Sequence, residues 1–152
     1  MTNTLTSPQT AGELARLFAA AQTQEAAHTR EEAEQAGSTP AVPEEQLTAL
    51  ELADARQDVY MPVSAEGGRL LYALTRAARP QTVVEFGTSF GISTIFLAAG
   101  VIDNGAGRVF STELSTAKIH AARENLHQAG VDGPVTVLAG DGMEISSWTG
   151  GN

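Results

Sequence analysis

The sequence predicts an α/β fold in which helices alternate with the strands of a parallel sheet. Three short runs rich in β-branched residues, at 82–86, 108–112 and 134–139, are separated by helical segments. Amphipathic helical patterns precede the first run. Strands connected in this way run parallel through right-handed crossovers. We therefore expect the amino-terminal half of a doubly wound, Rossmann-like sheet, preceded by helices.

Residues 1–60 predict a helical leader or cap. Thr10 is a residue type that caps helices, and apolar residues recur behind it at helical spacing. The Glu-rich run 25–35 is typical of a solvated helical face. We expect the apolar side of this helix to be buried against the domain, rather than to line an acceptor site or a dimer contact; its residues are Leu14, Leu17 and Phe18.

A second leader helix is predicted after a break at 37–40. Pro43 suits a first helical turn, and acidic residues follow it at the positive end of the helix. The pattern ends near Asp58.

The strands and their connecting helices fall in residues 61–152. Ser64 is a capping residue for a helix that ends before Pro80, and a further helix is predicted over 92–99. Ser115 is the expected cap of the last helix, which Gly130 ends.

Composition excludes several classes of protein. The chain has 152 residues, 9 basic and 18 acidic, giving a net charge of −9, which disfavours binding to nucleic acid. It has no cysteine for a disulfide or a thiolate zinc site, and its three histidines are scattered, so we predict no structural metal site. No stretch is apolar enough to cross a membrane and no secretory signal opens the chain. We expect a cytoplasmic protein.

The position of the first strand suggests a partial domain. In doubly wound sheets that strand has neighbours on both sides, one of which comes late in the sequence. Little sequence follows the third strand here, so the first would be an apolar edge open to aggregation. We therefore expect a chain truncated after the third strand.

The segment 84–94 is the most informative for function. A strand there ends in Glu85, a glycine turn follows, and a helix begins near Gly91. Ligands bind where strand, turn and helix meet in this way. The glycine spacing fits neither a dinucleotide fingerprint nor a Walker A loop. An acid two residues before Gly87 would repel a pyrophosphate and suit a cationic ligand.

The motif at 83–94 resembles that of class I S-adenosylmethionine-dependent methyltransferases; it reads Val-Val-Glu-Phe-Gly-Thr-Ser-Phe-Gly-Ile-Ser-Thr. It is most similar to the small O-methyltransferases related to catechol and caffeoyl-CoA methyltransferases. Further landmarks are Met-Pro-Val-Ser-Ala-Glu-Gly-Gly at 61–68, Glu113, and Gly-Asp-Gly at 140–142. The resemblance implies S-adenosylmethionine as cofactor and a small-molecule methyl acceptor.

The resemblance also implies roles for individual residues. The Val63 backbone and the Ser93 hydroxyl would hold the methionine carboxylate of the cofactor, and Glu85 would face its amino group. Gly87 and Thr88 would form the floor beneath the cofactor. Asp141 would accept from the adenine amino group, and the Gly142 N–H would make a second contact with the adenine.

Glu113 has a role that its position also suggests. It closes the second strand, where a carboxylate can accept hydrogen bonds from both ribose hydroxyls. Metal dependence stays unknown, because the resemblance places the metal-binding acids beyond the third strand. We therefore assign no catalytic and no metal-binding residue.

Two other functions are open at this point. Under the first alternative, the chain would be an inactive truncated remnant or an interaction module whose leader helices pair with another chain. A homo-oligomer fits this alternative. A nicotinamide oxidoreductase is disfavoured by the broken glycine spacing. Four residues are expected to be incidental: three solvated histidines and one tail residue that could stack on an adenine, namely His28, His120, His127 and Trp148.

Overall fold

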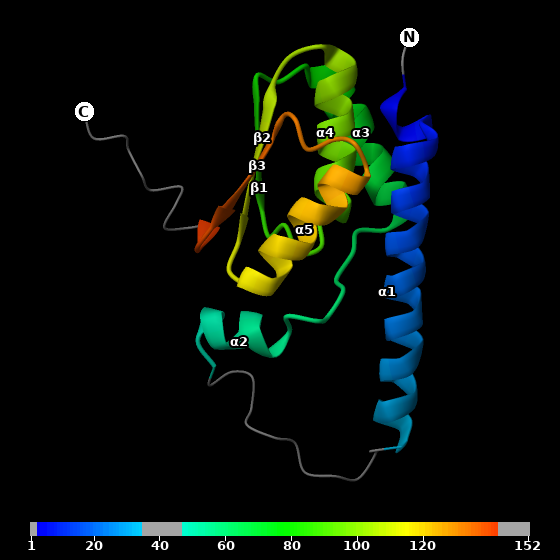
Figure 1. Cartoon of the computed structure of the whole chain (residues 1–152). Coiled ribbons are helices and arrows are strands. Elements are labelled where there is room, and N and C mark those ends of the chain that lie inside the picture. Colours follow the sequence, from blue (N-terminus) through cyan, green and yellow to red (C-terminus); the bar gives the residue numbers. More distant parts are fainter. Residues whose placement is uncertain (1–2, 35–46, 143–152) are drawn as a thin grey trace, which may run out of the picture.

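The computed structural model describes residues 3–34 and 47–142 (Figure 1). Three strands form one parallel sheet in the order β1-β2-β3. The elements are η1 (Thr4–Thr6), α1 (Pro8–Glu34), α2 (Ala49–Ala55), α3 (Ala65–Ala78), β1 (Thr82–Phe86), α4 (Ile92–Asn104), β2 (Arg108–Glu113), α5 (Thr116–Gln128) and β3 (Val135–Ala139). The predicted fold class is confirmed: the sheet and its crossovers match one half of a Rossmann-like fold.

The helices cover one face of the sheet. Figure 1 shows α3, α4 and α5 on the same side of the strands, with the long α1 outside them. Side chains along β1 alternate accordingly, because successive residues of a strand point to opposite faces. Val83 and Glu85 are half-buried on the covered face, whereas Val84 and Phe86 are about 60% exposed on the other.

The hydrophobic core lies between the sheet and the helices. Helix α4 is apolar on nearly all sides because it is enclosed by α3, α1 and the sheet. The leader helix contributes Leu14 and Leu17 to this core, and the Phe18 ring packs at 6.5 Å from that of Phe96. The expected burial of the apolar side of the leader helix is thus confirmed.

Two glycines allow α3 and α4 to pack closely. A Cβ atom on Gly68 would lie 2.3 Å from the Phe96 ring, and one on Gly100 would lie 2.8 Å from the Thr75 side chain. Real atoms do not approach so closely, so a larger residue at either position would separate the helices. Their spacing fixes where the amino end of α4 stands relative to β1.

Most predicted element boundaries are confirmed, and the capping roles of Ser64 and Ser115 are observed. The prediction for Thr10 was wrong. Proline suits the first position of a helix, and α1 begins at Pro8. The cap is therefore Ser7, the residue immediately before it, whose Oγ accepts from the Thr10 backbone N–H. The buried Thr10 hydroxyl instead donates to the carbonyl of Ala129.

Two other boundaries differ from prediction. Helix α2 is capped by Thr48 in a capping box with Glu51 and ends at Ala55, short of Asp58. The predicted start at Pro43 lies outside the described residues. Helix α4 was predicted to end at residue 99 but runs five residues further, to Asn104. Gly100 is compatible with a helix, and Gly105, in the left-handed conformation, ends it. In residues 3–34 and 47–142, no helix has the length and apolar character needed to span a bilayer.

Candidate functional site

The turn between β1 and α4 is held in an unusual backbone conformation. Gly87, Ser89 and Gly91 all have positive φ values, of 84°, 48° and 86°. The backbone N–H groups of Gly87 and Thr88 both donate to the carbonyl of Thr112, at 3.0 and 2.9 Å. These bonds bind the turn to the end of β2. A left-handed conformation is costly for the non-glycine residue, so the turn is a specified feature rather than a loose loop.

Gly87 leaves an open space at the carboxyl edge of the sheet. A Cβ atom at this position would meet no atom of the described residues within 4 Å, whereas one on Gly91 would touch Ala122 at 3.6 Å. The backbone of Gly87 is thus accessible to a ligand that lies flat against the turn.

The Glu85 carboxylate accepts hydrogen bonds from three side-chain hydroxyls. Ser93 Oγ donates to one carboxylate oxygen at 2.5 Å, while Thr94 Oγ1 and Ser111 Oγ donate to the other at 2.5 and 2.6 Å. Two of these donors come from the first turn of α4 and one comes from β2. Donors from both α4 and β2 therefore hold the acid in one orientation.

A fourth hydroxyl extends this network. Thr88 is 1% exposed, and its Oγ1 lies 2.6 Å from Ser111 Oγ. Ser111 gives its hydroxyl proton to Glu85, so its oxygen can accept from Thr88, whose hydroxyl also lies 3.1 Å from the Thr112 carbonyl. A chain of hydrogen bonds from Thr88 through Ser111 to Glu85 therefore connects the buried side of the turn with the acid.

Glu113, at the end of β2, is held by backbone N–H groups. One oxygen accepts from Leu114 and Ser115 at 2.9 and 3.0 Å, and the other accepts from Ser89 at 2.8 Å. The bond from Ser89 attaches the carboxylate to the turn after β1. A carboxylate offers about four acceptor positions, so capacity is left for a ligand hydroxyl.

The third strand brings Asp141 and Gly142 to the same edge. Both residues are half-buried, and the Gly140 N–H before them donates to the Glu113 carbonyl at 3.0 Å. A Cβ atom on Gly142 would lie 2.3 Å from the Phe86 ring, so glycine allows the chain to approach this side chain closely. All three predicted acids thus stand at the carboxyl ends of neighbouring parallel strands, where such sheets bind ligands.

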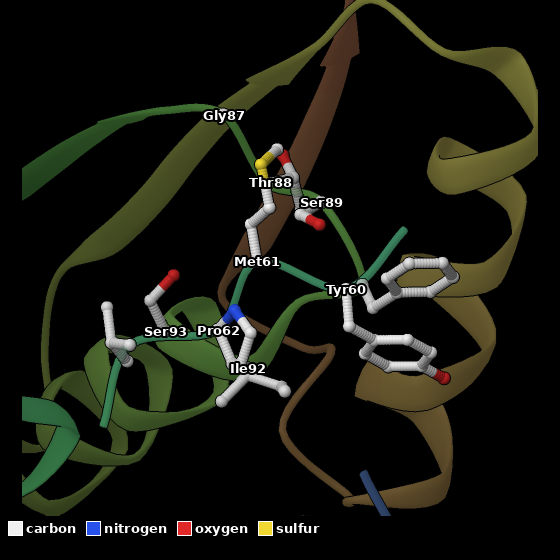
Figure 2. A pocket seen from close by; sticks show the side chains of 10 residues that line it. Tyr60, Met61, Pro62, Gly87, Thr88, Ser89, Ile92 and Ser93 are labelled. Carbon is white, nitrogen blue, oxygen red and sulfur yellow. The ribbon is translucent and has the colours of Figure 1, made fainter. Parts of the chain in front are cut away.

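Residues 58–63 form the opposite wall of the site, and we call this segment the strap. Figure 2 shows the Met61 side chain extending towards Gly87 and Thr88, with Ser93 on the other side of Pro62. The Tyr60 ring stacks on Phe90 at a centroid distance of 4.0 Å and an angle of 14°.

The strap and the turn enclose a small pocket of about 30 Å³, lined by Tyr60, Met61, Pro62, Val63, Gly87, Thr88, Ser89, Phe90, Ile92 and Ser93. This volume holds a few water molecules, so a larger ligand must also use the open carboxyl edge or displace the Met61 side chain.

The structure brings the predicted residues into one region but adds residues that the sequence did not single out. Val63 and Ser93 line the pocket, with Gly87 and Thr88 opposite. Ser111, Thr94 and the Ser89 N–H were missed. Their signal was weak: hydroxyl residues within an otherwise apolar strand and helix, whose partner could not be known without the strand register Glu85↔Ser111.

The three histidines expected to be incidental are not among the residues that line the pocket. His28, His120 and His127 are exposed on α1 and α5, and His127 Nδ1 lies 3.3 Å from Asp132. Trp148 lies outside the described residues. Within the two ranges that the structure describes, no three or more His, Asp or Glu side chains gather as metal ligands do.

Comparison with known proteins identifies the family. Residues 84–150 match the model of a methyltransferase domain. A catechol O-methyltransferase of Mycobacterium tuberculosis is 36% identical over 108 residues, which are 71% of this chain and 46% of that protein. The chain thus spans about half the length of the curated relatives it matches.

Solved structures agree with this identification. The O-methyltransferase from Bacillus cereus in complex with S-adenosylhomocysteine has a TM-score of 0.55 and 28% identity, covering 68% of this chain and 47% of that one. The O-methyltransferase TomG from Streptomyces achromogenes, in complex with S-adenosylmethionine, has a TM-score of 0.54 and 28% identity, covering 66% and 46%. The chain therefore belongs to the class I S-adenosylmethionine-dependent O-methyltransferase family, and its described residues form three parallel strands of a Rossmann-like sheet.

Proposed function

We propose that this chain is the cofactor-binding amino-terminal portion of an O-methyltransferase that acts on a small molecule. Residues 61–152 would form the partial cofactor-binding domain, and residues 1–60 the helical leader that covers it. The observation that carries the proposal is the placement of three acids, Glu85, Glu113 and Asp141, at the carboxyl ends of neighbouring parallel strands, the edge at which Gly87 leaves open space.

The chemistry of this edge fits an extended cationic cofactor. The flat backbone at Gly87 and Thr88 would form the floor beneath it. Glu85 would attract its ammonium group, and Glu113 would accept from its ribose hydroxyls with the acceptor positions that three N–H donors leave free. Asp141 would accept from the adenine amino group, beside the Gly142 N–H.

The methionine end requires one rearrangement. Ser93 donates its only hydroxyl proton to Glu85, so it has none to give to the cofactor carboxylate in this conformation. Rotation of the Ser93 side chain would redirect the proton, and Thr94 and Ser111 would continue to hold Glu85. The Val63 backbone, which also lines the pocket, would make the other contact.

When bound, S-adenosylmethionine supplies an electrophilic methyl group on its sulfonium. The described residues would bind and orient that group through Gly87, Glu85 and Glu113. The acceptor is proposed to be a small molecule because catechol is named for the mycobacterial relative. We assign no catalytic residue, and the metal dependence of the whole protein is not part of this proposal.

Calorimetric titration with S-adenosylhomocysteine, together with size-exclusion chromatography of the same sample, tests the proposal. We expect one molecule bound per chain by a folded, monodisperse sample. Absence of binding by such a sample would reject it.

A second candidate function is an inactive interaction module, which exposed apolar side chains favour. Four of these side chains are more than half exposed: Leu70 and Leu74 on α3, and Val84 and Phe86 on the uncovered face of β1. Exposed apolar side chains on a sheet are typical of a surface that another chain covers. Under this hypothesis the sample would form a defined oligomer, as a homo-oligomer or with another chain, and would have no affinity for S-adenosylhomocysteine.

A further inference from the structure

We propose that Gln24, on the leader helix α1, is a positioning residue for the cofactor site. It holds the strap, residues 58–63, at a fixed distance from the turn that carries Gly87. This inference rests on the proposed function, because it assigns the leader helix a part in cofactor binding.

The Gln24 carboxamide binds two backbone groups of the strap at once. Its Nε2 donates to the Asp58 carbonyl at 2.5 Å, and its Oε1 accepts from the Tyr60 N–H at 2.6 Å. Only one orientation of the amide satisfies both bonds. The side chain thus occupies the place that a peptide group of a neighbouring strand would take, and it satisfies backbone groups of a segment that lies in no sheet.

The same helix also supports the other side of the pocket. Arg16 Nη2 donates to Asn125 Oδ1 at 2.7 Å, and Asn125 Nδ2 donates to the Phe90 carbonyl at 2.9 Å. Phe90 in turn stacks on Tyr60. Helix α1 therefore holds the strap directly through Gln24, and the turn indirectly through Asn125.

The small volume of the pocket makes this spacing important for binding. Its walls are the strap on one side and Gly87, Thr88 and Ser93 on the other, and they enclose about 30 Å³. A small outward movement of the strap would therefore change the shape of the pocket by a large fraction. Met61 is next to Tyr60 in the chain and Val63 lies three residues after it, so a movement of Tyr60 would be passed on to both.

Three variants separate the clamp from general effects on the helix. Gln24→Met keeps length and helix propensity but removes both hydrogen bonds. Gln24→Glu keeps the acceptor for Tyr60 and removes the donor to Asp58. Gln22→Met makes the same exchange at an exposed position of α1 and serves as the matched control. Two quantities are measured for each: the exchange rate of the Tyr60 amide proton by NMR, and the dissociation constant of S-adenosylhomocysteine by calorimetry.

We expect Gln24→Met to speed exchange of the Tyr60 amide by about tenfold and to weaken S-adenosylhomocysteine by about fivefold to tenfold. Gln24→Glu should keep the Tyr60 amide protected and bind with intermediate affinity, whereas Gln22→Met should match the unsubstituted chain. Unchanged affinity in Gln24→Met would overturn this inference alone. Failure of the unsubstituted chain to bind would overturn the proposed function, and this inference with it.

Discussion

Ser111 Oγ donates a hydrogen bond of 2.6 Å to the carboxylate of Glu85, its direct partner across β1 and β2. Ser111 is fully buried, and the two residues lie at the carboxyl end of the sheet. The orientation of the acid is therefore set by the neighbouring strand as well as by the helix that follows its own strand. This contact makes the register of the sheet part of the site.

Replacement of Ser111 by alanine should destabilise the protein by about 1 to 2 kcal/mol. The change removes a donor to Glu85 and one of the two polar partners of the buried Thr88 hydroxyl, which keeps its bond to the Thr112 carbonyl. Urea unfolding at neutral pH measures the loss. Ser93→Ala is the control, because it removes another donor to the same carboxylate but at a half-buried position, and it should cost less. Equal losses in the two variants would contradict the proposed network.

Replacement of Gly87 by alanine should abolish binding of S-adenosylhomocysteine at a small cost in stability. The positive φ of 84° costs alanine about 1 to 2 kcal/mol, and its methyl group would occupy the floor of the site. Gly105→Ala is a matched control, since Gly105 has a φ of 75° and open space but caps α4 away from the site. Calorimetry and thermal unfolding of both variants decide: a similar effect of both on binding would refute a specific role for Gly87.

Replacement of Glu113 by glutamine should weaken S-adenosylhomocysteine by about tenfold to a hundredfold, because hydrogen bonds to a charged acceptor are stronger than those to a neutral one. Glu124→Gln, an exposed change on α5, should leave the affinity unaltered. The fold of the Glu113 variant is checked by circular dichroism, since Ser89, Leu114 and Ser115 also donate to this side chain. Unchanged affinity in a folded Glu113 variant would remove the proposed ribose contact.

Asp103 should contribute stability that depends on acid pH. Burial raises the pKa of this carboxyl, but hydrogen bonds from Thr4 and Tyr72 and the charge of Arg76 together hold it below its ordinary value of 3.8. A pKa that is lower in the folded than in the unfolded chain gives stability that is present above 3.8 and is lost as the pH falls through the folded value. Asp103→Asn should therefore be less stable at pH 7 and show a flatter decline towards acid.

Urea midpoints measured over a series of acid to neutral pH values test this. A parallel decline in the two proteins would mean that Asp103 does not produce the dependence.

The sequence predicted the strands, their parallel order and the position of the site, because these depend on local patterns. Thr82–Phe86 reads as a strand and the turn after it as a glycine turn without reference to the rest of the chain, whereas the exposure of Val84 and Phe86 does not follow from this pattern. The acids at the strand ends follow from the same pattern. Helix starts were less certain, as at Thr10, because Ser7 and Thr10 are both capping residue types and only the neighbouring proline distinguishes them.

The contacts that organise the site could not be predicted. Gln24 and Tyr60 are separated by 36 residues, and nothing in either segment indicates that the carboxamide of one binds the backbone of the other. The donors to Glu85 depend in the same way on register and on the spacing of α3 and α4. Tertiary packing sets these relationships, so they appear only in the folded chain.

A titration of the ¹⁵N-labelled chain with S-adenosylhomocysteine tests the proposed cofactor site most directly. Binding is monitored through the amide resonances in two-dimensional NMR spectra. We predict saturable shifts concentrated at Gly87, Thr88, Ser89 and Gly142. Thr136, near the amino end of β3, should change little. Saturable shifts at these positions would place the cofactor at the carboxyl ends of the strands. No shifts in a folded sample, or shifts confined to other residues, would contradict the proposed cofactor site.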